Sequence, residues 1–334
     1  MLLSAPGTRV RPPEACETGG FRRRRNTGFA PSLDLSLIAP ECGIAVRIMR
    51  PLFSILLPLV SVASAYSGDR VPTVYLNHFA VVIEQASYDA LRSSPEIAAL
   101  AKVDEAHVVA GSRNWTGFYI TGRQTYIELF GAAMAPEGQR LGDSQFNLSV
   151  EQAGGVAAIA ARLRTVFGTK VAVTSTPRTT PTGEIPWMKL ASVSGPGVMG
   201  TSIIEVDAGY LAAMHPGTNI EHPLSREQYN MWRFLPDHTL DDVVSVTAAL
   251  NPTEMAELAT EIELVGWAVQ RGTGGFVAVG PDVKLTVVPA GARAGIQQAD
   301  LRLRHSVPKQ VITLGSAKLL LEGETGRFIF WTQN

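Results

Sequence analysis

Two polar residues, His78 and Glu128, lie within stretches of sequence that are otherwise mostly apolar. His78 lies in residues 74–83 and Glu128 in residues 125–130, and both stretches are rich in Val, Ile, Tyr and Phe. Such stretches are typical of buried strands. An unpaired polar group in an apolar setting is costly, so each side chain needs a partner. A shared divalent metal ion would satisfy both; the structural alternatives are a buried ion pair or a hydrogen-bonded core histidine.

The region around His78 is repeated further along the chain. Residues 78–86 align without gaps on residues 145–153, and four of the nine positions are identical. Each copy leads through Glu-Gln-Ala into a predicted helix. The spacing of 67 residues, from position 78 to position 145, is too long for a solenoid repeat and fits a duplicated half-domain. The alignment places Gln145 at the position of His78; the alternative for Gln145 is a solvent-facing residue that opens its strand.

The elements that must position these residues follow the same order twice. Residues 74–130 read as a strand, a helix over 87–100 that Pro95 breaks or restarts, and three further strands. Residues 145–206 read as a strand, a helix and three strands, and Glu205 holds in the last strand the place that Glu128 holds in the first copy. The pattern predicts an α+β fold built from tandem β-α-β-β-β units.

A third pattern of the same kind follows, in which Asn251 and Pro252 open the helix and no inward His or Glu is expected on the strands. We therefore expect a first domain over 70–210, a linker over 211–240 and a second, degenerate domain of the same make over 241–334.

The N-terminal region shows the features of a processed segment. Residues 1–48 contain four consecutive arginines with scattered Pro and Gly, which indicates a non-structural extension. Residues 49–65 combine a basic start, an apolar run and an Ala-Ser-Ala ending, the pattern of a secretory signal peptide cleaved after Ala65. The apolar run is shorter than the about 20 residues of a membrane-spanning helix, and a retained membrane anchor is the alternative to a cleaved signal peptide. We expect a secreted or periplasmic protein with no membrane span in the mature chain. Met49 as the true start is a further hypothesis, which a native peptide from residues 1–48 in mass spectrometry would contradict.

The composition excludes several classes of function. A chain of 334 residues that is 46% hydrophobic and 18% charged suits a globular protein, and a formal net charge of −1 gives no indication of nucleic-acid binding. The two cysteines, Cys16 and Cys42, precede the predicted signal peptide, so no thiolate metal site or disulfide framework is expected in the folded part. No G-x-S-x-G motif supports a serine hydrolase. Nothing in the sequence specifies an oligomeric state.

Two β-α-β-β-β units, with His78 opening the first, Gln145 opening the second and a Glu in the last strand of each, resemble the vicinal oxygen chelate superfamily of glyoxalases, bleomycin-resistance proteins and dioxygenases. The stretch 75–130, with Trp-Thr-Gly at 115–117 and Thr-Tyr-Ile-Glu at 125–128, also looks like an uncharacterised glyoxalase-like family. In the superfamily, paired units form a half-open barrel around one divalent metal ion. The resemblance therefore implies half-open glyoxalase-like barrels and a metal held by His78, Glu128, Gln145 and Glu205.

The implied ligands are one imidazole, one amide and two carboxylates, a set that suits Zn, Ni, Fe or Mn. Such a metal would act as a Lewis acid on a small oxygen-chelating molecule, and Glu205 would leave it to serve as general base. We therefore expect a metal-dependent lyase, isomerase or dioxygenase. A metal-free protein that binds or sequesters a small molecule is the alternative from another class, and a structural domain with an emptied site is the third.

Overall fold

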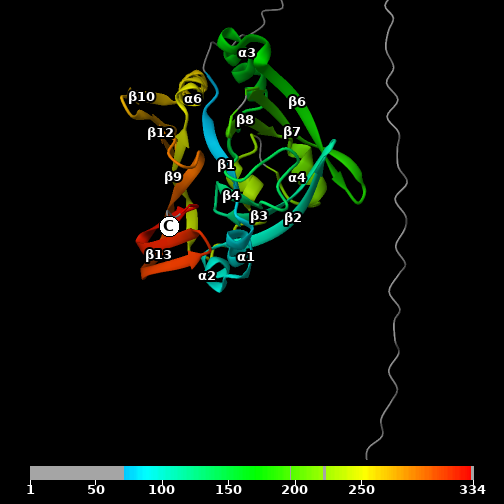
Figure 1. The fold of residues 1–334 in the computed structure, drawn as a ribbon. Helices are drawn as coiled ribbons and strands as arrows, with labels where there is room; N and C mark the ends of the chain where they lie inside the picture. The colour runs from blue at the N-terminus through cyan, green and yellow to red at the C-terminus, as the bar shows by residue number, and fades with distance from the viewer. Residues whose placement is uncertain (1–70, 196, 221–222, 332–334) are drawn as a thin grey trace, which may run out of the picture. The chain divides into compact units, whose positions relative to one another are not determined.

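The computed structural model describes residues 71–195, 197–220 and 223–331, which form a mixed α+β fold dominated by two β-sheets (Figure 1). The predicted N-terminal extension and signal peptide lie outside these residues. None of the helices in the described ranges is long and apolar enough to cross a membrane.

Sheet A has the strand order β2-β3-β4-β1-β5-β8-β7-β6. Its strands are β1 (Val74–Ile83), β2 (Lys102–Ala110), β3 (Arg113–Thr121), β4 (Tyr126–Gly131), β5 (Ser144–Val150), β6 (Val171–Thr180), β7 (Gly183–Val193) and β8 (Met199–Val206). Helices α1 (Gln85–Ser93) and α2 (Pro95–Leu100) follow β1, and α3 (Gly155–Phe167) follows β5. The predicted helix over 87–100 is thus two helices, because Pro95 begins α2 and the Ser94 side chain caps it.

The pairing of the strands curls sheet A into a half-barrel. β1 and β5 lie antiparallel at its centre, β1 is parallel to β4, and β5 is parallel to β8. The two edge strands, β2 and β6, approach each other. One face of the central strands is therefore enclosed by the curl, and the other faces outward.

Sheet B has the strand order β10-β11-β12-β9-β13-β14. Its strands are β9 (Leu240–Leu250), β10 (Ala268–Gly272), β11 (Gly275–Val279), β12 (Lys284–Pro289), β13 (Gly295–Leu314) and β14 (Ala317–Ile329), with α6 (Pro252–Leu264) after β9. As predicted, Asn251 and Pro252 open this helix; the Asn251 side chain accepts hydrogen bonds from the amides of Thr253 and Glu254. β9 is parallel to β12.

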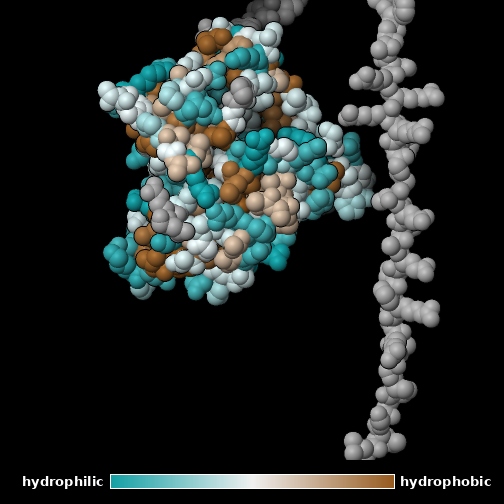
Figure 2. All heavy atoms as spheres, viewed as in Figure 1, coloured by the Kyte–Doolittle hydropathy of each residue, from teal (hydrophilic) through white to brown (hydrophobic). Residues whose placement is uncertain are grey.

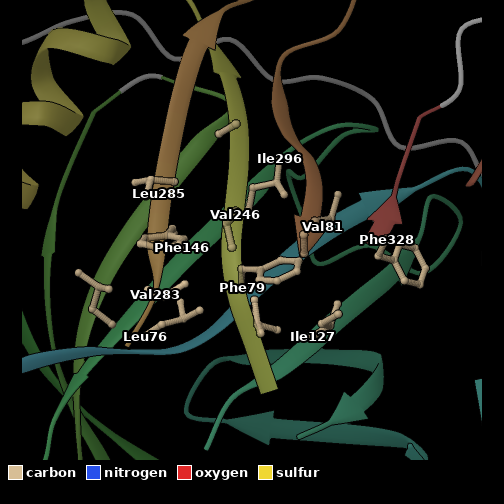
Figure 3. Packing of buried hydrophobic residues seen from close by; sticks show 14 of the residues in the cluster. Leu76, Phe79, Val81, Ile127, Phe146, Val246, Val283, Leu285, Ile296 and Phe328 are labelled. Carbon is tan, nitrogen blue, oxygen red and sulfur yellow. The ribbon is translucent and has the colours of Figure 1, made fainter. Parts of the chain in front are cut away.

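The outward face of β1 and β5 packs against sheet B. Phe79 and Phe146 lie opposite each other on the two strands, and Figure 3 shows them beside Val246, Leu285 and Ile296 of sheet B. The buried side chains of both sheets form one continuous apolar core. β1 is buried almost throughout because the core covers one of its faces and the curl of sheet A encloses the other.

The segment predicted as a linker is packed against sheet A. It contains the end of α4 (Ala208–Met214) and all of α5 (Arg226–Asn230), and its Leu211 and Leu224 side chains are buried in a second apolar cluster with Val108 and Trp187. Large exposed apolar residues are scattered elsewhere: Val166, Val173, Val279 and Val311 lie on four different elements. Figure 2 accordingly shows apolar residues in small patches among polar ones on the face in view.

The contact between α6 and β8 makes stability depend on pH. The Thr201 hydroxyl donates to the buried Glu261 carboxyl over 2.5 Å, and burial raises the pKa of Glu261 from 4.5 to about 7. The folded protein therefore holds this proton more tightly than the unfolded chain, so the contribution of Glu261 to stability falls as pH rises from about 4.5 to about 7 and is then constant. We expect Glu261→Gln to be about 2–3 kcal/mol more stable than the parent at pH 8 and similar to it at pH 4.5 in urea unfolding.

Glu263→Gln is the matched control, because Glu263 lies on the same helix but is exposed and pairs with Arg271. The prediction would be contradicted if the stability of Glu261→Gln relative to the parent were the same at pH 8 as at pH 4.5.

Candidate functional site

His78 lies on β1 and faces the inside of the curled sheet, where hydrogen bonds hold both ring nitrogens. Its Nδ1 is 2.7 Å from Asn77 Oδ1, and its Nε2 is 2.8 Å from Asn147 Nδ2. The Asn77 oxygen can only accept, so Nδ1 carries the hydrogen and Nε2 accepts from the Asn147 amide. The ring stacks on Tyr126 at 4.3 Å between centroids. Burial lowers the pKa of His78 to about 3, so the imidazole is neutral.

Asn147 is a site residue that the sequence analysis missed. It lies directly opposite His78 in the β1–β5 pair, and its Oδ1 accepts a hydrogen bond from Ser202 Oγ at 2.6 Å, which orients the amide toward the ring. A signal was available in the sequence, because Asn147 follows Gln145 by two positions and residues spaced by two share one face of a strand.

Glu128 lies on β4 beside β1, and two hydrogen bonds hold its carboxyl in place. Its Oε1 accepts hydrogen bonds from Trp115 Nε1 at 2.9 Å and from the Tyr119 hydroxyl at 2.6 Å. Its Oε2 is 3.6 Å from His78 Nε2. Burial raises the pKa of Glu128, and these two hydrogen bonds oppose the shift. The predicted proximity of His78 and Glu128 is thus present, but a neutral imidazole and a carboxyl with a raised pKa are not the buried ion pair offered as an alternative.

Gln145 lines the same cavity as His78 and Glu128, beside Gly200 of β8. Its place at the start of β5, on the enclosed face, agrees with the position that the sequence repeat gave it.

Glu205 lies elsewhere, and its predicted place in the site is corrected. Its two carboxylate oxygens accept hydrogen bonds from the amides of Gly154 and Val156, each at 3.1 Å, at the start of α3. Lys189 Nζ is 3.7 Å from the same carboxylate. A carboxylate is favourable at a helix N-terminus, so this side chain stabilises α3 and does not take part in the cavity.

The register of sheet A explains the correction. Glu128 lies beside Ala80 in the β4–β1 pair, and in the β8–β5 pair the residue beside Asn147 is Ser202. Ala80 precedes Asn147 by the same 67 positions that separate the two copies of the repeat. Ser202 therefore holds the place predicted for Glu205. Residues three apart on a strand point to opposite faces, which puts Glu205 on the outer face against α3.

The enclosed face of sheet A borders a cavity of about 1240 Å³. Its polar floor, which we define by side chains that share this face of the central strands, consists of His78, Tyr126, Glu128, Gln145 and Asn147. Trp115 and Trp187 form an aromatic wall, with ring centroids 6.4 Å apart and nearly parallel planes. A large concave space with a few convergent polar groups and groups of shifted pKa is typical of a small-molecule site.

The residues do not assemble the predicted four-ligand metal site. The Glu205 carboxylate accepts hydrogen bonds from the start of α3. His78 Nε2, the ring atom nearest Glu128, already accepts a hydrogen bond from the Asn147 amide. Across the part of the chain that the structure describes, no group of three or more His, Cys, Asp or Glu side chains is placed to hold a metal ion.

Fold and site together define a mixed α+β protein whose half-barrel sheet encloses a polar and aromatic cavity. The family of unknown function DUF5829 matches residues 76–330, and the chain belongs to this family.

Two solved structures are similar to the chain. A hypothetical protein from Staphylococcus aureus matches 72% of this chain and 96% of its own, with 10% identity and a TM-score of 0.47. A xylose isomerase-like TIM barrel/4-hydroxyphenylpyruvate dioxygenase fusion protein matches 68% of this chain, with 7% identity and a TM-score of 0.34, and the chain covers 36% of its length. No curated protein matches the sequence.

Proposed function

We propose that the chain binds a small organic molecule, without a metal ion, in the cavity of sheet A. The observation that carries the proposal is the cavity of about 1240 Å³, in which a hydrogen-bonded polar floor lies beside an aromatic wall. Asn77, Asn147, Trp115 and Tyr119 hold His78 and Glu128 in place, so the floor is organised before any ligand arrives. Preorganised polar groups in a concave apolar site fix the orientation of a ligand.

The proposal includes the glyoxalase-like arrangement of sheet A as two β-α-β-β-β units. The parallel pairing of β1 with β4 and of β5 with β8 supports it, as does the antiparallel contact of β1 with β5 around Phe79 and Phe146. The signal-peptide pattern of residues 49–65 adds a secreted or periplasmic location, where the protein would sequester its ligand.

A cavity-filling variant tests the proposal. A Cβ atom at Gly200 would have Gln145 Cγ as its nearest neighbour, at 3.8 Å, so a larger side chain at this position enters the cavity without meeting backbone. We expect the purified protein to bind the neutral fluorescent probe N-phenyl-1-naphthylamine, and Gly200→Phe to bind it about tenfold or more weakly. Gly274→Phe is the control, because Gly274 lies in open space on the β10–β11 turn. Equal affinity of the parent and of Gly200→Phe for this probe would contradict the proposal.

A metal-dependent lyase, isomerase or dioxygenase is the second candidate. One observation favours it: His78 Nε2 and Glu128 Oε2 lie 3.6 Å apart at the cavity floor, which Gln145 shares. Elemental analysis separates the two candidates. Near-stoichiometric metal in the parent, lost in both His78→Ala and Glu128→Ala with the fold intact, would favour the enzyme. No bound metal after addition of Ni, Zn, Fe and Mn would favour the binding protein.

A further inference from the structure

Two arginines border the cavity from different elements, Arg178 on β6 and Arg233 three residues after α5. Each guanidinium lies over an aromatic ring of the cavity lining: Arg178 Cζ is 4.9 Å from the Trp187 ring centroid, and Arg233 Cζ is 5.0 Å from that of Tyr119. A ring beneath a guanidinium contacts its face. The N–H donors, which lie in the plane at its edge, stay available to a further partner.

The two arginines differ in their carboxylate partners among the described residues, and neither has one within hydrogen-bond distance. Arg178 takes part in no ion pair there, and Arg233 meets Asp104 at 3.8 Å between Nε and Oδ2. Neither guanidinium donates a hydrogen bond within the same ranges, although the Arg233 side chain is only 30% exposed. Arg226 shows the contrast, since its buried guanidinium pairs with both Glu151 and Asp282.

The carboxyl groups that line the cavity do not balance this charge. Glu137 is exposed and lies outside the floor, in the segment between β4 and β5. Arg233 and Arg178 lower the pKa of Glu128, but burial raises it by more. The Glu128 carboxyl accepts its hydrogen bonds from Trp115 and Tyr119. The cavity therefore presents two guanidinium groups near its aromatic wall: Arg178 takes part in no ion pair among the described residues, and Arg233 has Asp104 as its ion-pair partner at 3.8 Å.

We infer that the ligand of this cavity is an organic anion, whose carboxylate, sulfonate or phosphate group is received by Arg178 and Arg233 and whose flat apolar part lies against Trp115 and Trp187. The inference rests on the proposed function and names its ligand class. The guanidinium fork matches the paired oxygens of such groups, and charge-assisted hydrogen bonds are the strong ones. Aromatic side chains supply the apolar contact area.

Two probes of similar aromatic body and different charge test the inference. 8-Anilinonaphthalene-1-sulfonate carries the anionic group, and N-phenyl-1-naphthylamine is its neutral counterpart. In fluorescence titrations of the purified protein, we expect the anionic probe to bind about tenfold more tightly than the neutral one. Arg178→Gln and Arg233→Gln should each weaken the anionic probe about tenfold and the neutral probe by about twofold or less. Arg327→Gln is the control, because this arginine lies on sheet B and pairs with Asp300.

The outcomes separate the two levels of the proposal. Equal affinity for both probes, or an anionic-probe affinity unaffected by Arg178→Gln and Arg233→Gln, would overturn the organic-anion inference and leave the cavity as a neutral binding site. Failure of both probes to bind, or binding that Gly200→Phe does not weaken, would overturn the proposed function and the inference with it. Recovery of the anionic-probe affinity in Arg178→Lys, with the weaker point charge of lysine, would support a role for the charge itself.

Discussion

Replacing Arg226 by methionine is expected to lower the free energy of unfolding by about 3 kcal/mol, measured by urea denaturation followed by circular dichroism. Arg226 is the first residue of α5, and its side chain is 5% exposed. Its guanidinium holds partners from four separate segments, namely the carbonyl of Leu76 and the side chains of Gln124, Glu151 and Asp282. Methionine fills similar volume but leaves the two carboxylates without their counter-ion. Water reaches both, which keeps the cost at the lower end of the range for a broken buried pair.

The same substitution should loosen the segment that carries α4 and α5. Arg226 joins this segment to β1, the end of β5 and the β3–β4 turn, so limited proteolysis of Arg226→Met should cut within residues 207–238 earlier than in the parent. Arg327→Met is the matched control, because the Arg327 side chain also pairs with a carboxylate but is 53% exposed, and its loss should cost less than about 1 kcal/mol. A cost for Arg226→Met no larger than that of the control would refute the structural role.

Phe79→Ala should destabilise the protein by about 3–5 kcal/mol, because it opens a cavity where the two sheets meet. Phe79 is fully buried and lies opposite Phe146 (Figure 3). Its ring also makes a T-shaped contact with that of Phe330, from the C-terminal end of the fold. Since the apolar core is continuous across both sheets, we expect one unfolding transition that circular dichroism and tryptophan fluorescence report at the same urea concentration.

The control for Phe79→Ala is Val311→Ala on β13, where the side chain is 57% exposed and the loss should be about 0.5 kcal/mol or less. Two separate transitions, of which Phe79→Ala shifts only one, would instead support the two predicted domains, 70–210 and 241–334, as independent folding units.

Local patterns in the sequence determined the elements around the site. The apolar composition of residues 74–83 predicts a buried strand, and β1 occupies this range. The start of α2 at Pro95 and the cap of α6 at Asn251 depend on side chains within one turn of the helix start, so the sequence suffices to predict them. The proximity of His78 and Glu128 was also accessible, because a lone polar residue on a buried strand needs a partner.

The membership of the site was decided by the tertiary structure. A lone carboxylate in a predicted strand locates the residue that faces the site only to within a few positions. A shift of three positions moves a side chain to the opposite face of the sheet. Glu205 therefore meets α3, while Ser202 faces the cavity beside Asn147. The cross-strand contact of Asn147 with His78 follows from the antiparallel register of β1 and β5.

The two cavity arginines and the packed segment depend on contacts that no local pattern encodes. Arg178 and Arg233 are 55 positions apart in the chain, yet both border one cavity, where Arg178 lies over Trp187 and Arg233 lies over Tyr119. Leu211 and Leu224 of the segment predicted as a linker are buried with Trp187 and Val108 because apolar side chains spaced irregularly along a segment still gain by leaving water. Short-range periodicity thus determined the strands and helices, and the curl and register of sheet A decided which side chains face one another.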